Sequence, residues 1–304
     1  MHWDNVTAGR RAAGHISGMW ADLGQAAGSR TVGLRRIQVD PGSWATPAHV
    51  HEADEEIFYV LAGSGLSWQD GACFDVGAGD CLVHLAGAEA HTLRADDEGL
   101  DVLAFGTRTR MGSAHWPRTG LSLLGRTWVE VGEGAAWDEK EAAAGEPEVT
   151  GPQERPASIV HENAVKPVHW GEGERASIWR RNVSHEAGSV KTGLRVVVVD
   201  PERYGTVPHC HSSEEELFVV LDGDGLLELG EEKHPVRRGT VISRPAGTGV
   251  EHAMQAGTGG LTFLAYGTRE PNDITYYPRS NKVFIRGVGL IGRVEPLNYW
   301  DGER

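Results

Sequence analysis

One motif occurs twice in this chain, 160 residues apart, and this duplication constrains the fold more than any other feature. The segment PAHVHEADEEIFYVLAG, residues 47–63, returns as PHCHSSEEELFVVLDG, residues 208–223. The flanking sequence repeats too, since AGSRTVGLRRIQVDP starting at Ala27 matches AGSVKTGLRVVVVDP starting at Ala187. Self-similarity over this distance predicts two domains built on the same plan.

Each copy carries the local signals of β-strands. Short β-branched or aromatic runs, such as residues 57–61 and 196–199, are separated by Gly, Pro and Asp clusters, and 41 glycines are available for turns. No segment shows a sustained apolar stripe at helical spacing. The pattern predicts an all-β chain made of two antiparallel sandwiches or barrels.

An acidic segment separates the two copies. Residues 129–154 contain eight carboxylates and one lysine, with glycines and prolines that interrupt regular structure. We therefore expect an N-terminal barrel over residues 1–124, a linker over 125–158 and a C-terminal barrel over 159–304. Trp128 and Trp137 indicate that part of the linker packs onto a domain. We also expect the tail, residues 282–304, to lie across a barrel or the interface between the barrels.

Composition excludes several classes of partner and site. A net charge of -14 and a pI near 5.4 argue against binding to nucleic acid or to an anionic membrane. No apolar run approaches the length of a membrane span, so we expect a cytoplasmic protein. The three cysteines predict neither a disulfide framework nor a thiolate zinc site. Cys210 lies between two histidines, and strand alternation should turn it away from them as a buried residue.

The repeated motif carries a His-x-His pair in each half. In an extended strand both imidazoles of such a pair lie on one face. A later segment of each half, GDCLVHLAGAEAH at 79–91 and GTVISRPAGTGVEH at 239–252, adds a further histidine. Neutral imidazoles with a carboxylate suit first-row transition ions and leave open positions for water, oxygen or substrate.

The His-x-His motif and the later segment of each half resemble the two sequence motifs of the cupin superfamily. Their presence in both halves makes the chain resemble a bicupin. The resemblance implies two tandem jelly-roll barrels with one divalent transition metal each: Fe, Mn, Ni, Co, Cu or Zn. It assigns the metal ligands as His49, His51, Glu56 and His91 in the first barrel and His209, His211, Glu216 and His252 in the second. Leu85 replaces the motif proline in the first copy, whereas Pro245 retains it in the second.

Glu55 and Glu215 are alternative ligands, because the strands that follow are apolar on both faces. The seven-residue step to Gly63 selects Glu56, as the step to Gly223 selects Glu216.

Other residues receive weaker predictions. Phe58 and Phe218 share strand parity with the ligand glutamates, so they either line a substrate pocket or belong to the core. Arg108 and Arg269 either bind a carboxylate or, as we favour, make a structural ion pair shared by both halves. His84 and Arg244 occupy matching positions and either differentiate the two cavities or reflect tolerant surfaces.

Three functions are compatible with these sites. The leading hypothesis is an oxygenase, similar to the quercetin dioxygenases, that acts on a small oxygen-bearing substrate with O2, with Glu56 or Glu216 accepting a proton. The first alternative is a non-oxidative isomerase, lyase or decarboxylase, as in the oxalate decarboxylases. The second is a non-enzymatic small-molecule or metal-binding protein. We expect a monomer or a homodimer, because the duplicated barrels can pair within one chain.

Overall fold

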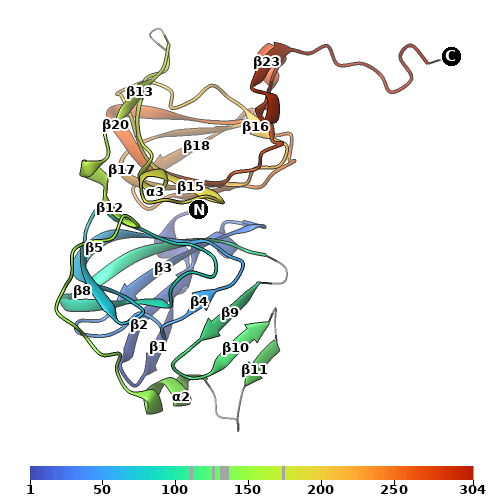
Figure 1. The fold of residues 1–304 in the computed structure, drawn as a ribbon. Helices are drawn as coiled ribbons and strands as arrows, with labels where there is room; N and C mark the ends of the chain where they lie inside the picture. The colour runs from blue at the N-terminus through green and yellow to red at the C-terminus, as the bar shows by residue number, and fades with distance from the viewer. Residues whose placement is uncertain (110–111, 125–126, 131–136, 173–174, 304) are drawn as a thin grey trace.

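The computed structural model describes residues 1–109, 112–124, 127–130, 137–172 and 175–303. Two β-barrels, one from each copy of the repeat, are stacked on each other (Figure 1). The predicted all-β chain with two tandem jelly-roll barrels is confirmed.

The strands are short apart from two long pairs. In the N-terminal half they are β1 (Gly9–Ala13), β2 (Ile16–Asp22), β3 (Val32–Val39), β4 (Val50–His51), β5 (Glu56–Gln69), β6 (Ala72–Gly77), β7 (Asp80–His84), β8 (His91–Thr107), β9 (Ser113–Trp116), β10 (Leu121–Leu124) and β11 (Thr127–Glu130). After β12 (Ile159–His161), the C-terminal half contains β13 (Val168–Trp170), β14 (Ile178–Arg181), β15 (Thr192–Val199), β16 (Cys210–His211), β17 (Glu216–Leu229), β18 (Glu232–Arg237), β19 (Val241–Arg244), β20 (His252–Thr268), β21 (Ile274–Tyr277), β22 (Lys282–Ile285) and β23 (Leu290–Arg293).

Each barrel combines a large sheet with a four-stranded sheet. In the first barrel the large sheet has the order β1-β2-β3-β8-β5-β7-β12, with β6 paired to β5, and the small sheet has the order β11-β10-β9-β4. The second barrel repeats this plan as β13-β14-β15-β20-β17-β18, with β19 paired to β17, and β16-β21-β22-β23. The central pairs, β5 with β8 and β17 with β20, are antiparallel and irregular at matching positions.

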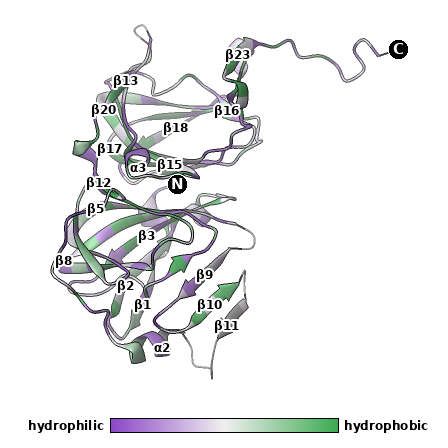
Figure 2. Ribbon diagram, viewed as in Figure 1, coloured by the Kyte–Doolittle hydropathy of each residue, from purple (hydrophilic) through white to green (hydrophobic). Residues whose placement is uncertain are grey.

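The strands that follow the ligand glutamates are apolar on both faces because each face packs against a different core. Phe58 and Val60 of β5 lie in the interior core of the first barrel. Ile57 and Tyr59, on the other face, belong to a cluster that contains residues of both barrels. Figure 2 shows the hydrophobic stretches on strands of the two barrels. Parity along β5 therefore assigns alternate residues to the cavity and to the interface between barrels.

The two barrels share one hydrophobic core. Phe105 of β8 and Tyr266 of β20 occupy equivalent positions in the repeat, and their rings contact each other at a centroid distance of 4.9 Å. Both side chains are buried, as are Leu34 and Leu194 in the same cluster. Each such side chain contributes about 1.5–3 kcal/mol of burial free energy. Because this core contains side chains of both barrels, the packing of the two barrels against each other is part of the folding of the chain.

Gly63 and Gly223 are glycines for a steric reason. Both have positive φ, 80° and 75°, at the irregular point of the long strands. A Cβ at Gly63 would stand 2.1 Å from the carbonyl oxygen of Gly99, and one at Gly223 would stand 2.2 Å from that of Gly260. The bend that these glycines permit starts seven residues after each ligand glutamate.

Short segments are exchanged between the barrels. Trp3, in the 3-10 turn η1 (Trp3–Asn5), donates its backbone N–H to the carbonyl of Gly239 in the second barrel at 2.9 Å. Reciprocally, β12 pairs with β7 of the first barrel, and Glu162 donates to the carbonyl of Gly79 at 2.9 Å. The expected domain limits, 1–124, 125–158 and 159–304, thus remain a proposal in which each barrel also carries a segment from the other half.

The linker packs onto the first barrel, whereas the end of the chain does not pack. Helix α2 (Trp137–Ala144) buries Glu141, and the carbonyl of Glu148 accepts a 3.1 Å hydrogen bond from Trp68 Nε1. The side chains of Trp128 and Trp137 lie outside the described part of the chain. The expectation for the tail is wrong beyond β23, because residues 295–303 are exposed and extend away from both barrels (Figure 1).

Candidate metal centres

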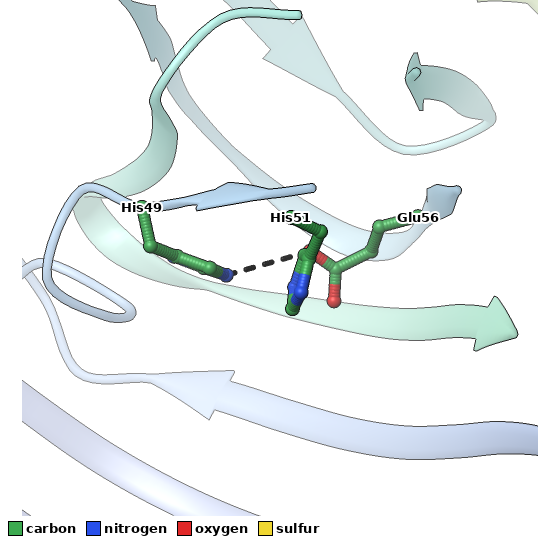
Figure 3. Close-up of side chains that lie close together, drawn as sticks. All are labelled: His49, His51 and Glu56. Atoms are coloured by element: carbon green, nitrogen blue, oxygen red, sulfur yellow. Dashed lines mark ion pairs between the residues drawn. The ribbon is translucent and has the colours of Figure 1, made fainter. Parts of the chain in front are cut away.

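The first barrel gathers its four predicted ligands at one point. Glu56 Oε2 lies 3.6 Å from His49 Nε2, 3.6 Å from His51 Nε2 and 3.0 Å from His91 Nε2. Figure 3 shows His49 and His51 directed at the Glu56 carboxylate. Backbone hydrogen bonds in both directions between His49 and His91 hold these two ligands side by side, although 42 residues separate them in sequence.

The second barrel repeats this arrangement. Glu216 Oε2 lies 3.5 Å from His211 Nε2 and 3.0 Å from His252 Nε2. His209, Glu216 and His252 together offer ligand atoms within 4.8 Å of one another. His209 and His252 also exchange backbone hydrogen bonds. The structure therefore brings together all eight residues that the sequence predicted as ligands.

The other ring nitrogens are held by groups behind the ligands. The carbonyl of Pro47 lies 2.9 Å from His49 Nδ1, and the carbonyl of Val207 lies 2.8 Å from His209 Nδ1. His211 Nδ1 instead contacts Asp273 Oδ2 at 2.7 Å. Such contacts fix the tautomer that leaves Nε2 as a lone-pair donor and hold the ring in place.

Burial and the imidazoles compete in setting the ionisation of the first centre. Burial opposes the charge on Glu56, but the surrounding histidines hold its pKa well below its usual range. Burial, with a smaller effect of the neighbouring His84, lowers the pKa of His91 to about 3. The centre thus presents an ionised carboxylate and a neutral imidazole, which are the forms that bind a metal.

The second centre has the same electrostatic pattern. Burial disfavours ionised Glu216, yet the close contact and the charge of His252 lower its pKa. Burial and His252 also lower the pKa of His209 to about 4. Burial works against protonation of His211, but contact with Asp273 raises its pKa.

The residues present fit a divalent transition metal in each barrel. Glu216 Oε2 and His252 Nε2 are buried and lack a hydrogen-bond partner among the described residues, although a buried polar atom normally has one. A bound cation would satisfy both atoms. Three imidazoles and one carboxylate suit Mn, Fe, Co, Ni, Cu or Zn and leave positions for a substrate.

The two centres differ beside the third histidine. In the first barrel the His84 ring stacks on His91 at 3.7 Å, and its Nδ1 lies 2.6 Å from Glu89 Oε1. In the second barrel Arg244 takes this position and donates to the carbonyl of Val250 at 2.5 Å. His84 and Arg244 are largely buried against the centres and are not tolerant surface residues, but neither lines its cavity, so a role in differentiating the cavities stays a prediction.

Both centres open into cavities. Phe58 lines the first, of about 380 Å³, and Phe218 lines the second, of about 190 Å³. These two side chains also belong to the interior cores, so both interpretations of them hold for the structure, and contact with a substrate stays a prediction.

Several partners of the site were not predicted from the sequence. Glu214, which lines the second cavity, pairs with Arg286, and burial raises its pKa to about 7. Asp273, which orients His211, follows the second barrel's last long strand in a region where the two copies differ. Comparison of the copies gave no signal for Asp273, whereas Glu214 aligns with another acidic residue, Asp54, in the repeated motif.

Glu55 and Glu215, the alternative ligands, face the interface between the barrels. The buried carboxylate of Glu55 accepts hydrogen bonds from the backbone N–H groups of Val190 and Thr192 at 2.8 and 3.1 Å. Reciprocally, Glu215 accepts one from the backbone of Thr31 at 2.6 Å. The seven-residue steps to Gly63 and Gly223 therefore selected the glutamates that face the cavities, Glu56 and Glu216.

The favoured structural pairing of the repeated arginines holds in one copy. Arg108 makes an ion pair with Asp22 at 3.0 Å. In the second copy Asn182 replaces that aspartate, and Arg269 donates to the carbonyl of Ser189 at 2.8 Å. Cys210 is buried, as expected, and Cys73 and Cys81 are buried too.

A family comparison decides the classification. The cupin domain model matches residues 35–105 and again 195–265, the two segments that carry all eight ligands. The chain is a bicupin of the cupin superfamily. No curated protein sequence matches this bicupin. None of its described helices is long and apolar enough to cross a membrane.

Solved structures of oxalate decarboxylases share the bicupin fold. The Bacillus subtilis enzyme at pH 4.6 is 15% identical, with a TM-score of 0.57 over 90% of this chain and 78% of the other. A structure of the same enzyme, studied for its Mn(II) centres, is 16% identical with a TM-score of 0.58 over 90% and 78%. The Lactobacillus farciminis enzyme in complex with formate is 16% identical, with a TM-score of 0.58 over 88% and 85%.

Proposed function

We propose that this bicupin is a metal-dependent lyase of the decarboxylase type that acts on a small carboxylate substrate. The observation that carries the proposal is the geometry of the two centres, in which three imidazoles and one glutamate converge at the wall of a cavity. The solved oxalate decarboxylases, which share the fold, support lyase chemistry over the oxygenase chemistry of the leading sequence-based hypothesis.

His49, His51, Glu56 and His91 would hold the metal of the first barrel, and His209, His211, Glu216 and His252 that of the second. When bound, such an ion supplies a Lewis acid that polarises a carboxylate or carbonyl oxygen. The chain's own residues position the imidazoles, since Pro47, Val207 and Asp273 hold the Nδ1 atoms. Phe58 and Phe218 give each cavity an apolar part of its wall.

The predicted second role of Glu56 and Glu216, as proton acceptors, is less well supported than their role as ligands. The low pKa of both carboxylates makes them weak bases. We therefore propose them as ligands only.

An assay of carbon dioxide release and oxygen uptake tests the proposal. Mn2+-loaded protein is incubated with a panel of small mono- and dicarboxylates while both gases are followed. The proposal expects carbon dioxide without net consumption of oxygen, and no turnover in a variant carrying Glu56→Gln and Glu216→Gln. Stoichiometric oxygen uptake with any substrate would instead establish an oxygenase. Inertness of the metal-loaded protein across the panel would favour a non-enzymatic binding protein.

A further inference from the structure

Besides Arg108 in the first barrel and Arg269 and Arg286 in the second, a pair of arginines lines the wall of each cavity. In the first barrel these are Arg11 of β1 and Arg35 of β3, and in the second Arg180 of β14 and Arg195 of β15. Among the described residues, no carboxylate makes an ion pair with any of the four. Three of the four side chains are exposed and Arg180 is half-buried, so a chain of net charge -14 presents two clusters of positive charge at the cavity walls.

Each pair is held close despite repulsion between its members. Partial burial and the nearby Arg35 lower the pKa of Arg11, and partial burial with Arg195 does the same for Arg180. Arg180 Nε is buried and has no hydrogen-bond partner in the described structure. An anion between the two guanidinium groups would relieve the repulsion and satisfy their N–H donors.

One arginine of each pair lies over a tryptophan ring. The strands that carry the arginine and the tryptophan are exchanged between the two copies. Arg11 lies over the ring of Trp20 at 5.2 Å, and Arg180 lies over the ring of Trp170 at 4.6 Å. By strand register, the first barrel has arginine on its edge strand and tryptophan on the next strand, whereas the second has tryptophan on β13 and arginine on β14. The same cation-π platform is thus built from opposite placements.

The sheet surface between the metal centre and the arginines, here called the floor, consists mostly of small residues. Across the strands β5, β8 and β3, Glu56 is followed by Gly106 and then Gly33, while Phe58 is followed by Ala104 and then Arg35. Two strand spacings place the backbone of Arg35 about 10 Å from that of Phe58. Ala104 leaves the row from Phe58 to Arg35 without a large side chain in its middle, whereas the Arg108 side chain covers Gly33, with its Nε 3.1 Å from the place of a Cβ.

The second barrel repeats this arrangement, with the Arg269 side chain over Gly193. There Glu216 is followed by Gly267 and Gly193, and a parallel row runs from Phe218 through Ala265 to Arg195.

We infer that each cavity takes an organic acid with two separated ends: an oxygen group for the metal and a remote carboxylate for the arginine pair. The ligand is longer than a two-carbon diacid, because the pairs stand across the floor from the metal ligands. Planar guanidinium groups suit a carboxylate, which they bind through two parallel hydrogen bonds. This inference names the substrate class of the proposed lyase and rests on that proposal for the metal end of the ligand.

Calorimetric titration of the Mn2+-loaded protein tests the inference without relying on turnover. The probes are glutarate, adipate and suberate, compared with oxalate and with hexanoate, which lacks the second carboxylate. We expect at least one longer diacid to bind more tightly than both comparison acids. Arg35→Gln and Arg195→Gln should each weaken its binding about tenfold at one site, with Mn2+ content unchanged. Arg30→Gln, an exposed arginine outside the lining of both cavities, is the matched control.

Three results would overturn the inference: none of the longer diacids binds, oxalate binds as tightly as they do, or the variant with both substitutions binds them like the wild type. Arg35 and Arg195 are exposed and make no hydrogen bond or ion pair with other described residues, so both variants should fold. If no acid is turned over but arginine-dependent binding persists, the proposed lyase activity fails while the acid-binding site stands.

Discussion

Glu55 in the first barrel accepts a 3.1 Å hydrogen bond from the backbone N–H of Thr192 in the second barrel. The neighbouring Glu56 lies on the opposite face of the strand and contributes its carboxylate to the first metal centre. Consecutive glutamates thus serve the interface and the site, and β-strand parity separates the two roles. Substitutions at the two positions should have different consequences.

Replacing Glu55 with alanine should destabilise the protein without loss of metal. The buried carboxylate also accepts hydrogen bonds from Ser189 and Val190, each 2.8 Å long. Its removal therefore leaves several buried donors without an acceptor. We expect the free energy of unfolding to fall by about 3 kcal/mol, measured by denaturant titration. Glu52→Ala, at an exposed position, should change it by no more than about 0.5 kcal/mol. Loss of bound metal in Glu55→Ala would contradict this assignment.

Cys81 should report on opening of the interface. It is fully buried in the core shared by the barrels, and burial raises the pKa of its thiol. In a Cys73→Ser and Cys210→Ser background, a thiol reagent at pH 8 should therefore label the folded protein only slowly. Adding Glu55→Ala should accelerate labelling, since the interface is weakened. Rapid labelling of the protein with Glu55 intact would show that the barrels do not share a closed core.

Asp273→Asn should weaken metal binding in the second barrel alone. Asp273 contacts His211 Nδ1 at 2.7 Å, and loss of such a partner typically reduces metal affinity by about 10–100-fold. Competition with a chelator should reveal one weakened and one unchanged site per chain. Asp75→Asn, on an exposed position of β6, provides the control. Equal affinities of the two sites in Asp273→Asn would show that this carboxylate does not orient the ligand.

The ligand sets could be predicted from the sequence because each ligand has a counterpart at the matching position of the other copy. The eight ligands recur at matched spacing, and Gly63 and Gly223 need positive φ at a bend whose position is linked to Glu56 and Glu216. Apolar alternation alone could not choose between Glu55 and Glu56, since β5 is buried on one face by its own barrel and on the other by its partner.

Other features depend on contacts that no local pattern encodes. The pairing of Trp3 with Gly239 and of β12 with β7 joins segments far apart in the sequence. The arginine platforms escaped comparison of the copies because arginine and tryptophan exchange places between strands. The free tail was misplaced because its apolar residues, such as Trp300, indicated packing that the structure does not show.

Metal stoichiometry tests the central claim most directly. Protein purified from cells grown with added Mn2+ should contain two equivalents of transition metal per chain by elemental analysis. The count should fall to one in Glu56→Gln and in Glu216→Gln, and to none in the variant with both, while Glu52→Gln retains two. Two equivalents in the variant with both substitutions, or none in the wild type after Mn2+ loading, would contradict the assignment of one three-histidine, one-glutamate centre to each barrel.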